Sequence, residues 1–181
     1  KRTIIKKVIN QDADYGKSDT FEGKSINVEF VSANPTGDLH LGHARQAALG
    51  DSICRLLAAA GYKVTREYYI NDAGNQIHNL ALSLKARYYE LLGRQVTLPE
   101  DGYHGKEIIE IAKEIYNEHQ DTKLNEDIPY FKQEGLNILL EAIKKDLDRF
   151  RVNFDVFTSE QSLCDKGEVE TVLNTFKKSD N

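Results

Sequence analysis

Two histidines three positions apart, His40 and His43, stand where a loop passes into a helix. An apolar, strand-like run and the turn Pro35-Thr36-Gly37 precede them, and Gly42 lies between the two rings. The free backbone N–H groups and the dipole of a helix N-terminus favour a phosphate. Imidazoles at the same place add hydrogen bonds to charge that develops during phosphoryl or nucleotidyl transfer. The pattern therefore indicates ATP chemistry.

Two other interpretations of His40 and His43 stay open. Their spacing allows two metal ligands, but no cysteine lies nearby and no third ligand follows at a recognised spacing, so we expect no metal site. They are otherwise helix-entry residues without a function. Gly42 favours the phosphate interpretation, because a residue without a side chain lets a flat base or a phosphate approach the backbone. The sequence has no Gly-x-Gly-x-x-Gly and no Gly-Lys-Ser/Thr motif, which argues against a dinucleotide dehydrogenase and a P-loop NTPase.

The composition is that of a soluble globular protein. The 181 residues are 40% hydrophobic and 29% charged, enough for one domain or for one domain with an insertion. A net charge of −5 argues against a large non-specific nucleic-acid surface. Two distant cysteines, Cys54 and Cys164, and the lack of a signal peptide or membrane-spanning run predict a cytoplasmic protein without a membrane partner. Because methionine is absent, we expect a fragment of a longer chain.

Hydrophobic periodicity predicts the elements around the histidines. Alternation over 26–31 and a β-rich run over 63–70 indicate two strands, with a helix from about 41 to 60 between them that ends at Gly61. The order strand, helix, strand implies a parallel crossover. Apolar residues at steps of three and four predict the packed face of that helix as Ala48, Leu49, Ile53, Leu56, Leu57 and Ala60.

The second half of the chain is mostly helical. Asn71 or Asp72 is expected to cap a helix, and further helices are expected near 105–119 and 129–150. Val152, Phe154 and Val156 alternate as a third strand, and a last helix follows Asp165. The pattern predicts an α/β fold in which a helical segment interrupts a parallel sheet. The basic run Lys144, Lys145, Arg149 and Arg151 is interpreted as a solvated helix face.

Glu29 is a carboxylate near the carboxyl end of the first strand. It alternates with Val28 and Phe30, so its side chain faces the other side of the sheet. A carboxylate in that place needs a partner. The residues leave two partners open, namely Arg66 on the neighbouring strand or a cationic substrate in the crevice at the strand ends.

Two blocks of the sequence resemble one known family. The run from Asn27 to His43, which contains Val-Glu-Phe-Val-Ser-Ala-Asn-Pro-Thr-Gly and His-Leu-Gly-His, resembles the catalytic signature of arginyl-tRNA synthetases, which are class I aminoacyl-tRNA synthetases. The block Arg66 to Gln76 is similar to the next block of the same family, and Phe154–Val156 and Glu160–Leu163 are similar to a later one. The resemblance implies a Rossmann-like catalytic domain that joins L-arginine to ATP, with Mg²⁺, and then passes arginine to tRNA(Arg).

The resemblance also implies roles on the ATP side of the site. His40 and His43 would be catalytic and would stabilise the phosphates of ATP in the adenylation transition state. Gly42 would let adenine pack closely, and Thr36 would belong to the same ATP-binding set. The chemistry is in-line attack of the arginine carboxylate on the α-phosphorus, which depends on positioning and charge stabilisation.

On the arginine side, the resemblance implies a second set of residues. Ser32 and Asn34 would hold the backbone groups of arginine, Glu29 would contact its cationic parts, and His40 would complete the set. A bidentate carboxylate–guanidinium contact would favour arginine over lysine.

The sequence departs from the family in three ways. Asp38 stands where the family often has proline, the Lys-Met-Ser-Lys-Ser loop is absent, and so is the anticodon-binding domain. We therefore expect the tail of a preceding domain at 1–24, the first half of the catalytic domain at 25–92, a helical insertion at 93–150 and a truncated return at 151–181.

Such a piece is expected to be inactive by itself, while the parent protein is expected to be a monomer. Two alternatives remain, namely another class I synthetase or nucleotidyltransferase with the same His-x-Gly-His site, and a non-catalytic truncated paralogue that acts as a binding module.

Overall fold

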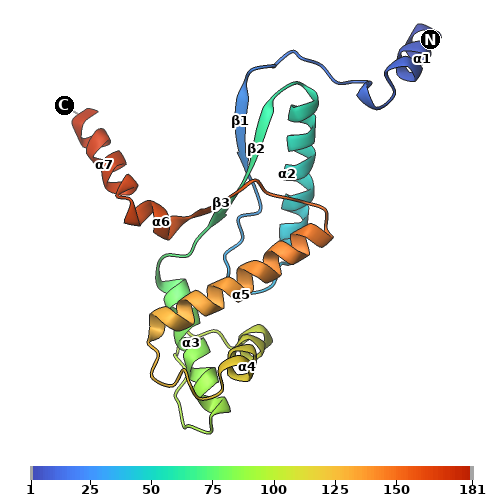
Figure 1. Cartoon of the computed structure of the whole chain (residues 1–181). Coiled ribbons are helices and arrows are strands. Elements are labelled where there is room, and N and C mark those ends of the chain that lie inside the picture. The colour runs from blue at the N-terminus through green and yellow to red at the C-terminus, as the bar shows by residue number, and fades with distance from the viewer. Residues whose placement is uncertain (1, 180–181) are drawn as a thin grey trace.

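The computed structural model describes residues 2–179 and contains a parallel sheet flanked by helices (Figure 1). The strands are β1 (Ser25–Glu29), β2 (Lys63–Ile70) and β3 (Val156–Ser159), in the spatial order β1-β2-β3. Both pairs are parallel, with Val28 opposite Arg66 and Tyr69 opposite Thr158. The predicted α/β fold with a parallel sheet is confirmed.

The helices fall into four groups along the chain. The helix α2 (Leu41–Ala59) connects β1 to β2, and α3 (Asn75–Leu91), α4 (Lys106–His119) and α5 (Ile128–Arg149) lie between β2 and β3. The helices α6 (Glu160–Asp165) and α7 (Glu168–Ser179) follow β3, while α1 (Arg2–Gln11) and a 3₁₀ turn at Asp12–Asp14 precede β1. Figure 1 shows α1 and α7 extending away from the sheet, and neither helix contains a buried residue. Among the described residues, no helix is both apolar and long enough to cross a membrane.

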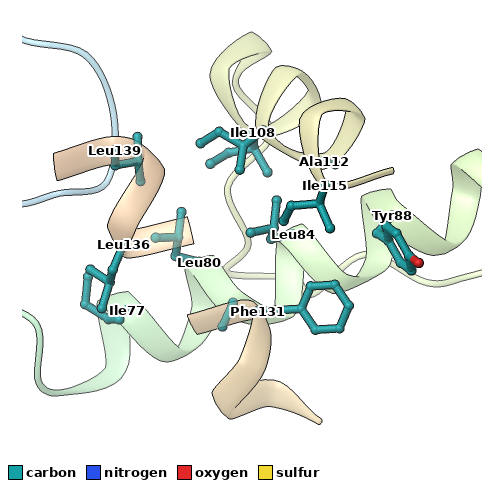
Figure 2. Close-up of a cluster of buried hydrophobic side chains, with 12 residues drawn as sticks. Ile77, Leu80, Leu84, Tyr88, Ile108, Ala112, Ile115, Phe131, Leu136 and Leu139 are labelled. Atoms are coloured by element: carbon teal, nitrogen blue, oxygen red, sulfur yellow. The ribbon is translucent and has the colours of Figure 1, made fainter. Parts of the chain in front are cut away.

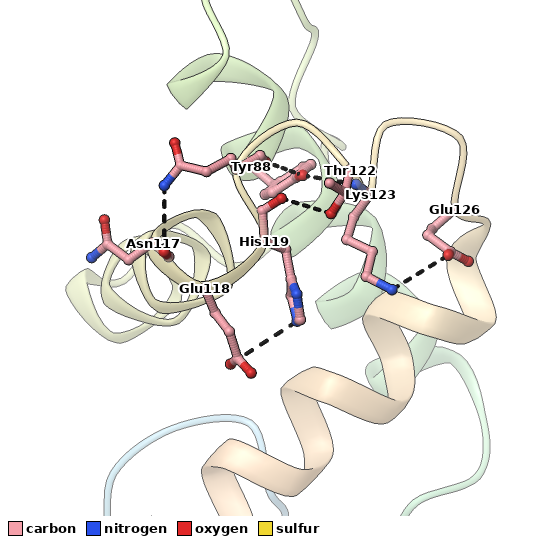
Figure 3. A network of polar contacts seen from close by, with 8 residues as sticks. Tyr88, Asn117, Glu118, His119, Thr122, Lys123 and Glu126 are labelled. Carbon is pink, nitrogen blue, oxygen red and sulfur yellow. Dashed lines mark hydrogen bonds and ion pairs between the residues drawn. The ribbon is translucent and has the colours of Figure 1, made fainter.

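The main hydrophobic core lies among α3, α4 and α5. Figure 2 shows its side chains converging from the three helices, and the buried set comprises Ile77, Leu80, Ala81, Leu84, Tyr88, Ile108, Ile111, Ala112, Ile115, Phe131, Leu136 and Leu139. Tyr88 extends this core into the turn between α4 and α5, where its hydroxyl donates to the Gln120 carbonyl and accepts from the Lys123 N–H at 3.3 Å (Figure 3). The core and the turn make these helices one packed unit.

A second core cluster joins the sheet to the site. Its buried residues come from the β1–α2 loop, α2, β2, α5 and the segment after α5, and they are Val31, Ala33, Ala47, Tyr68, Ile70, Ile143, Leu147 and Val152. Phe154 is partly buried and packs against this cluster, and the centroid of its ring lies 4.5 Å from that of Phe30. The carboxyl end of the sheet is therefore packed against the C-terminal half of α5.

The predicted packed face of α2 is wrong. The buried residues of this helix are Ala47, Gly50 and Cys54, whereas Leu49 and Leu56 are 59% and 72% exposed. The face of α2 with small side chains packs on the sheet, because small side chains let the helix approach the strands closely. At Gly50, a Cβ atom would overlap the ring of Phe30 and lie 2.7 Å from the Phe30 Cβ.

The third strand begins later than predicted, at Val156. Val152 is apolar because its side chain is buried in the second core cluster. Its N–H donates to the Leu147 carbonyl at 2.9 Å and the Arg151 N–H donates to the Asp148 backbone carbonyl at 2.8 Å, and these two bonds close the end of α5. Arg151 has a φ of 63°, so a residue other than glycine occupies the left-handed position of this helix end. Phe150, the residue after α5, is 49% exposed.

We expect Gly50→Ala to destabilise the chain by about 1–3 kcal/mol, because the added methyl group collides with Phe30 near its backbone. Helix propensity alone predicts the opposite sign, a gain of about 1 kcal/mol. Urea denaturation followed by circular dichroism measures the difference, with Ser52→Ala on the exposed side of α2 as the control. A Gly50→Ala variant as stable as the parent would contradict the close contact.

Candidate functional site

The loop between β1 and α2 lies at the carboxyl end of the sheet and is tied to β2. The Phe30 N–H donates to the Glu67 carbonyl at 3.2 Å, directly after the last paired residue of β1. The Tyr69 N–H then donates to the Ser32 hydroxyl at 3.1 Å, and the Tyr68 hydroxyl donates to the Ala33 carbonyl at 2.9 Å. The loop therefore continues the pairing of β1 with β2 through side chains.

His40 and His43 cap the N-terminus of α2 together. Nδ1 of His40 accepts the Gly42 N–H at 3.1 Å, and Nδ1 of His43 accepts the His40 N–H at 3.2 Å. Their rings are stacked, with centroids 3.7 Å apart. Because each Nδ1 is an acceptor, the proton of each neutral ring is on Nε2. Two Nε2–H donors are then available at the start of the helix.

Burial lowers the pKa of His43 below its ordinary value of 6.5, and the neighbouring His40 lowers it further. The neutral ring that accepts the His40 N–H is therefore the favoured form near neutral pH. It can donate one hydrogen bond from Nε2 without bringing a positive charge against the stacked ring.

Gly42 lies directly beneath the His40 ring. A Cβ atom at this position would come 2.9 Å from Cε1 and 3.1 Å from Nδ1 of His40. The glycine therefore leaves room for the capping ring of His40. Because the Gly42 N–H already donates to His40, a phosphate at this helix end would be held by the Nε2–H donors or would displace that ring.

A cavity of about 720 Å³ lies between the N-terminus of α2 and the C-terminus of α5. From α2 and the residues before it come Leu39, His40, Leu41, His43, Ala44 and Ala47, and from α5 and its end come Asp146, Leu147, Arg149 and Phe150. The sequence predicts no site residue on α5. It indicates Arg149 only as part of a solvated basic helix face, and no local pattern places that face opposite the histidines.

Glu29 and Ser32 share a separate hollow of about 400 Å³ at the edge of β1, beside Gln46 and Gly50 of α2. Arg66 is not the partner of Glu29, because it lies opposite Val28 and contacts Asp51 at 3.7 Å. Within residues 2–179 no ion pair involves the Glu29 carboxylate. Of the two partners that the sequence left open, the internal arginine is therefore excluded.

Asn34 and Thr36 occupy the middle of the loop between these two hollows. The Thr36 N–H donates to the Asn34 carbonyl at 2.8 Å, and the exposed Asn34 amide donates to Gln76 of α3 at 3.0 Å. The structure thus groups Glu29 with Ser32 and His40 with His43, but it does not bring the two groups into one cavity. Within the described range, no group of three His, Cys, Asp or Glu side chains is arranged to bind a metal ion.

The block after β2 does not cap α3 as predicted. The N-cap of α3 is Gly74, and it makes no side-chain hydrogen bond. Asp72 instead accepts from the Ser159 hydroxyl at 2.6 Å and from the Gln161 N–H at 2.8 Å. Its carboxylate thereby joins the ends of β2 and β3. Asp72 and Ser159 lie far apart in the sequence, so no local pattern predicts this contact.

Comparison with protein families and relatives identifies the class of this fold and site. The family model of the catalytic domain of class I (R) tRNA synthetases matches residues 4–180. The chain is 52% identical to arginine–tRNA ligase 1 of Halalkalibacterium halodurans over 181 residues, which are 98% of this chain and 33% of that protein. It is 50% identical to the arginine–tRNA ligase of Bacillus subtilis over 179 residues, 97% of this chain and 32% of that protein.

Solved structures agree with this assignment. A crystal structure of a Campylobacter jejuni protein assigned as an arginyl-tRNA synthetase superposes with a TM-score of 0.84 at 34% identity, over 98% of this chain and 39% of that one. The arginyl-tRNA synthetase of Thermus thermophilus, at 21% identity, a TM-score of 0.51 and 98% and 30% coverage, shares the fold alone. The chain belongs to the family of class I (R) tRNA synthetase catalytic domains. It spans about a third of the length of the curated relatives it matches.

We expect the ring of His43 to titrate with a midpoint below 6.5, because burial and the neighbouring His40 ring both disfavour its charged form. Protonation of Nδ1 would also break its bond to the His40 N–H. The unfolded chain then binds the proton more readily than the folded one. The contribution of His43 to stability is therefore complete above pH 6.5 and is lost as the pH falls through the lowered pKa. NMR titration of the imidazole resonances, assigned with His43→Gln, measures the midpoint. A midpoint at or above 6.5 would contradict the capping geometry.

Proposed function

We propose that the chain is part of an arginine–tRNA ligase that activates L-arginine with ATP and transfers it to tRNA(Arg). One oxygen of the arginine carboxylate forms a bond to the α-phosphorus, the bond from the α-phosphorus to the bridging oxygen breaks, and pyrophosphate leaves with the electron pair. The 3′-terminal ribose of the tRNA then attacks the carbonyl carbon, and AMP leaves. Family membership together with the loop from Glu29 to His43 supports the proposal.

On the ATP side, we assign catalytic roles to His40 and His43. In this assignment their Nε2–H groups donate to oxygens of the ATP phosphates, where negative charge grows in the transition state. The acceptor bonds at both Nδ1 atoms support it, because they leave the proton of each neutral ring on Nε2. Gly42 keeps the start of α2 open for adenine. We assign Thr36, which lies in the loop before α2, to ATP binding as well. Mg²⁺ would accompany ATP as part of that substrate and would neutralise phosphate charge.

On the arginine side, the free Glu29 carboxylate supports binding of a cation. Glu29 contacts the guanidinium or ammonium group, while Ser32 and Asn34 hold the backbone groups of arginine, with His40 at the boundary between the two substrates. Burial raises the pKa of the Tyr69 hydroxyl, and the carboxylates of Glu160, Asp72 and Glu29 raise it further. The field at this end of the sheet is therefore negative, which suits a cationic amino acid.

The remaining features of the proposal concern the complete protein. It is a cytoplasmic enzyme and a monomer, with no membrane partner. Within it, residues 1–24 link to a preceding domain, 25–92 form the first half of the catalytic domain, 93–150 form a helical insertion and 151–181 return to the catalytic domain.

Glu29→Gln in the complete protein that contains this chain is expected to raise the KM for arginine roughly 10- to 100-fold. This is the effect of losing a hydrogen bond to a charged group. The KM for ATP stays unchanged, because Glu29 lies outside the cavity of His40 and His43. Arginine-dependent exchange of pyrophosphate into ATP measures both constants. Glu141→Gln, an exposed glutamate on α5, is the matched control. Activation of a different amino acid by the unaltered protein would refute the proposed function.

The 181-residue chain alone is expected to attach no arginine to tRNA(Arg), because its sequence contains no Lys-Met-Ser-Lys-Ser loop to bind the second side of ATP. Incorporation of radiolabelled arginine into tRNA measures this, with the complete protein as the positive control. Charging by the isolated chain at a rate near that of the complete protein would show that the residues present here suffice.

A further inference from the structure

The loop that carries Ser32 and Asn34 has an unfavourable backbone conformation. Val31 has a φ of 65° and Ser32 a φ of 40°, and the Ser32 N–H donates to the Phe30 carbonyl at 2.9 Å across Val31. This is a three-residue turn with a positive central φ, the rare and strained form. A β-branched residue in the left-handed region is an outlier, and such strain persists only where the surrounding structure enforces it.

Two contacts from β2 enforce this conformation. The Tyr69 N–H donates to the Ser32 hydroxyl at 3.1 Å, and the Tyr68 hydroxyl donates to the Ala33 carbonyl at 2.9 Å. Tyr68 is completely buried and Ala33 is 5% exposed, so water cannot replace the second bond. Burial raises the pKa of Tyr68 to about 12, so its hydroxyl stays a donor throughout the neutral range.

Tyr68 is completely buried beneath the loop that carries Ser32 and Asn34. Its ring is fixed by Phe154 and Phe157, each with its centroid 5.3 Å away, and the hydroxyl points to the backbone between Ser32 and Asn34. We propose that Tyr68 is a positioning residue for the amino-acid side of the site: its hydroxyl holds the Ala33 carbonyl and keeps the strained turn in the form that presents Ser32 and Asn34. This inference rests on the proposed function.

The ATP side does not depend on this bond. His40 and His43 are positioned by hydrogen bonds within the first turn of α2, and those bonds involve only His40, Gly42 and His43. Loss of the Tyr68 hydroxyl therefore changes the arginine half of the site and leaves the phosphate half in place. A split between the two substrate constants separates this role from a general loss of stability.

The test is Tyr68→Phe in the complete protein, assayed by arginine-dependent pyrophosphate exchange. The substitution keeps the aromatic packing and removes only the donor. We expect the KM for arginine to rise roughly tenfold and the KM for ATP to change by less than about twofold.

The matched control is Tyr88→Phe. Tyr88 is also completely buried, and its hydroxyl also donates to a backbone carbonyl, that of Gln120, but in the turn between α4 and α5 (Figure 3). We expect it to lower the melting temperature by an amount similar to that of Tyr68→Phe while leaving both KM values unchanged. An unchanged arginine KM in Tyr68→Phe, or an equal rise in both KM values, would overturn the inference.

The experiment separates the inference from the function on which it rests. If the unaltered protein shows no arginine-dependent exchange, the proposed function fails, whatever the variants do. If Tyr68→Phe does not fold, the double variant Val31→Gly/Tyr68→Phe replaces it, since glycine adopts the positive φ without strain. An arginine KM above that of Val31→Gly alone supports the role of the hydroxyl, and an equal KM overturns it.

Discussion

The parallel pairing of β1 with β2, extended into the following loop, is the constraint on which the site depends. The last backbone hydrogen bond between the two runs from the Phe30 N–H to the Glu67 carbonyl. Beyond it, the Ser32 hydroxyl accepts from β2 and the Tyr68 hydroxyl donates to the loop. These bonds force the chain through two left-handed residues and deliver it to the N-terminus of α2, where His40 and His43 cap the helix. The strained loop carries Ser32 and Asn34, and the N-terminus of α2 holds His40 and His43 by hydrogen bonds of its own.

The order of the elements and the parallel sheet could be predicted from hydrophobic periodicity, because strands and helices bury their apolar residues at different periods. The packed face of α2 could not. Its sequence offers a face with large side chains, which includes Leu49 and Leu56, and a face with small ones, which includes Ala47 and Gly50. Periodicity favours the first, but close approach to Phe30 requires the second, and that requirement comes from the sheet rather than from the helix.

The start of β3 shows the same limit. Val152 and Phe154 alternate like strand residues, yet Val152 closes α5 and Phe154 packs on Phe30 before any pairing begins. The usual signal for such a helix end is glycine, and here Arg151 takes its place. In the site, the local pattern predicts His40 and His43, and the bonds by which they cap α2 are also local. The opposing residues of α5 lie about a hundred positions further along the chain, so no local pattern places them there.

A crystal structure of the complete protein with L-arginine and a non-hydrolysable ATP analogue tests the central claim most directly. The account predicts the cationic groups of arginine within hydrogen-bond distance of Glu29, its backbone groups at Ser32 and Asn34, and the phosphates at Nε2 of His40 and His43. Arginine bound away from the β1–α2 loop, or phosphates that do not contact either histidine, would contradict it.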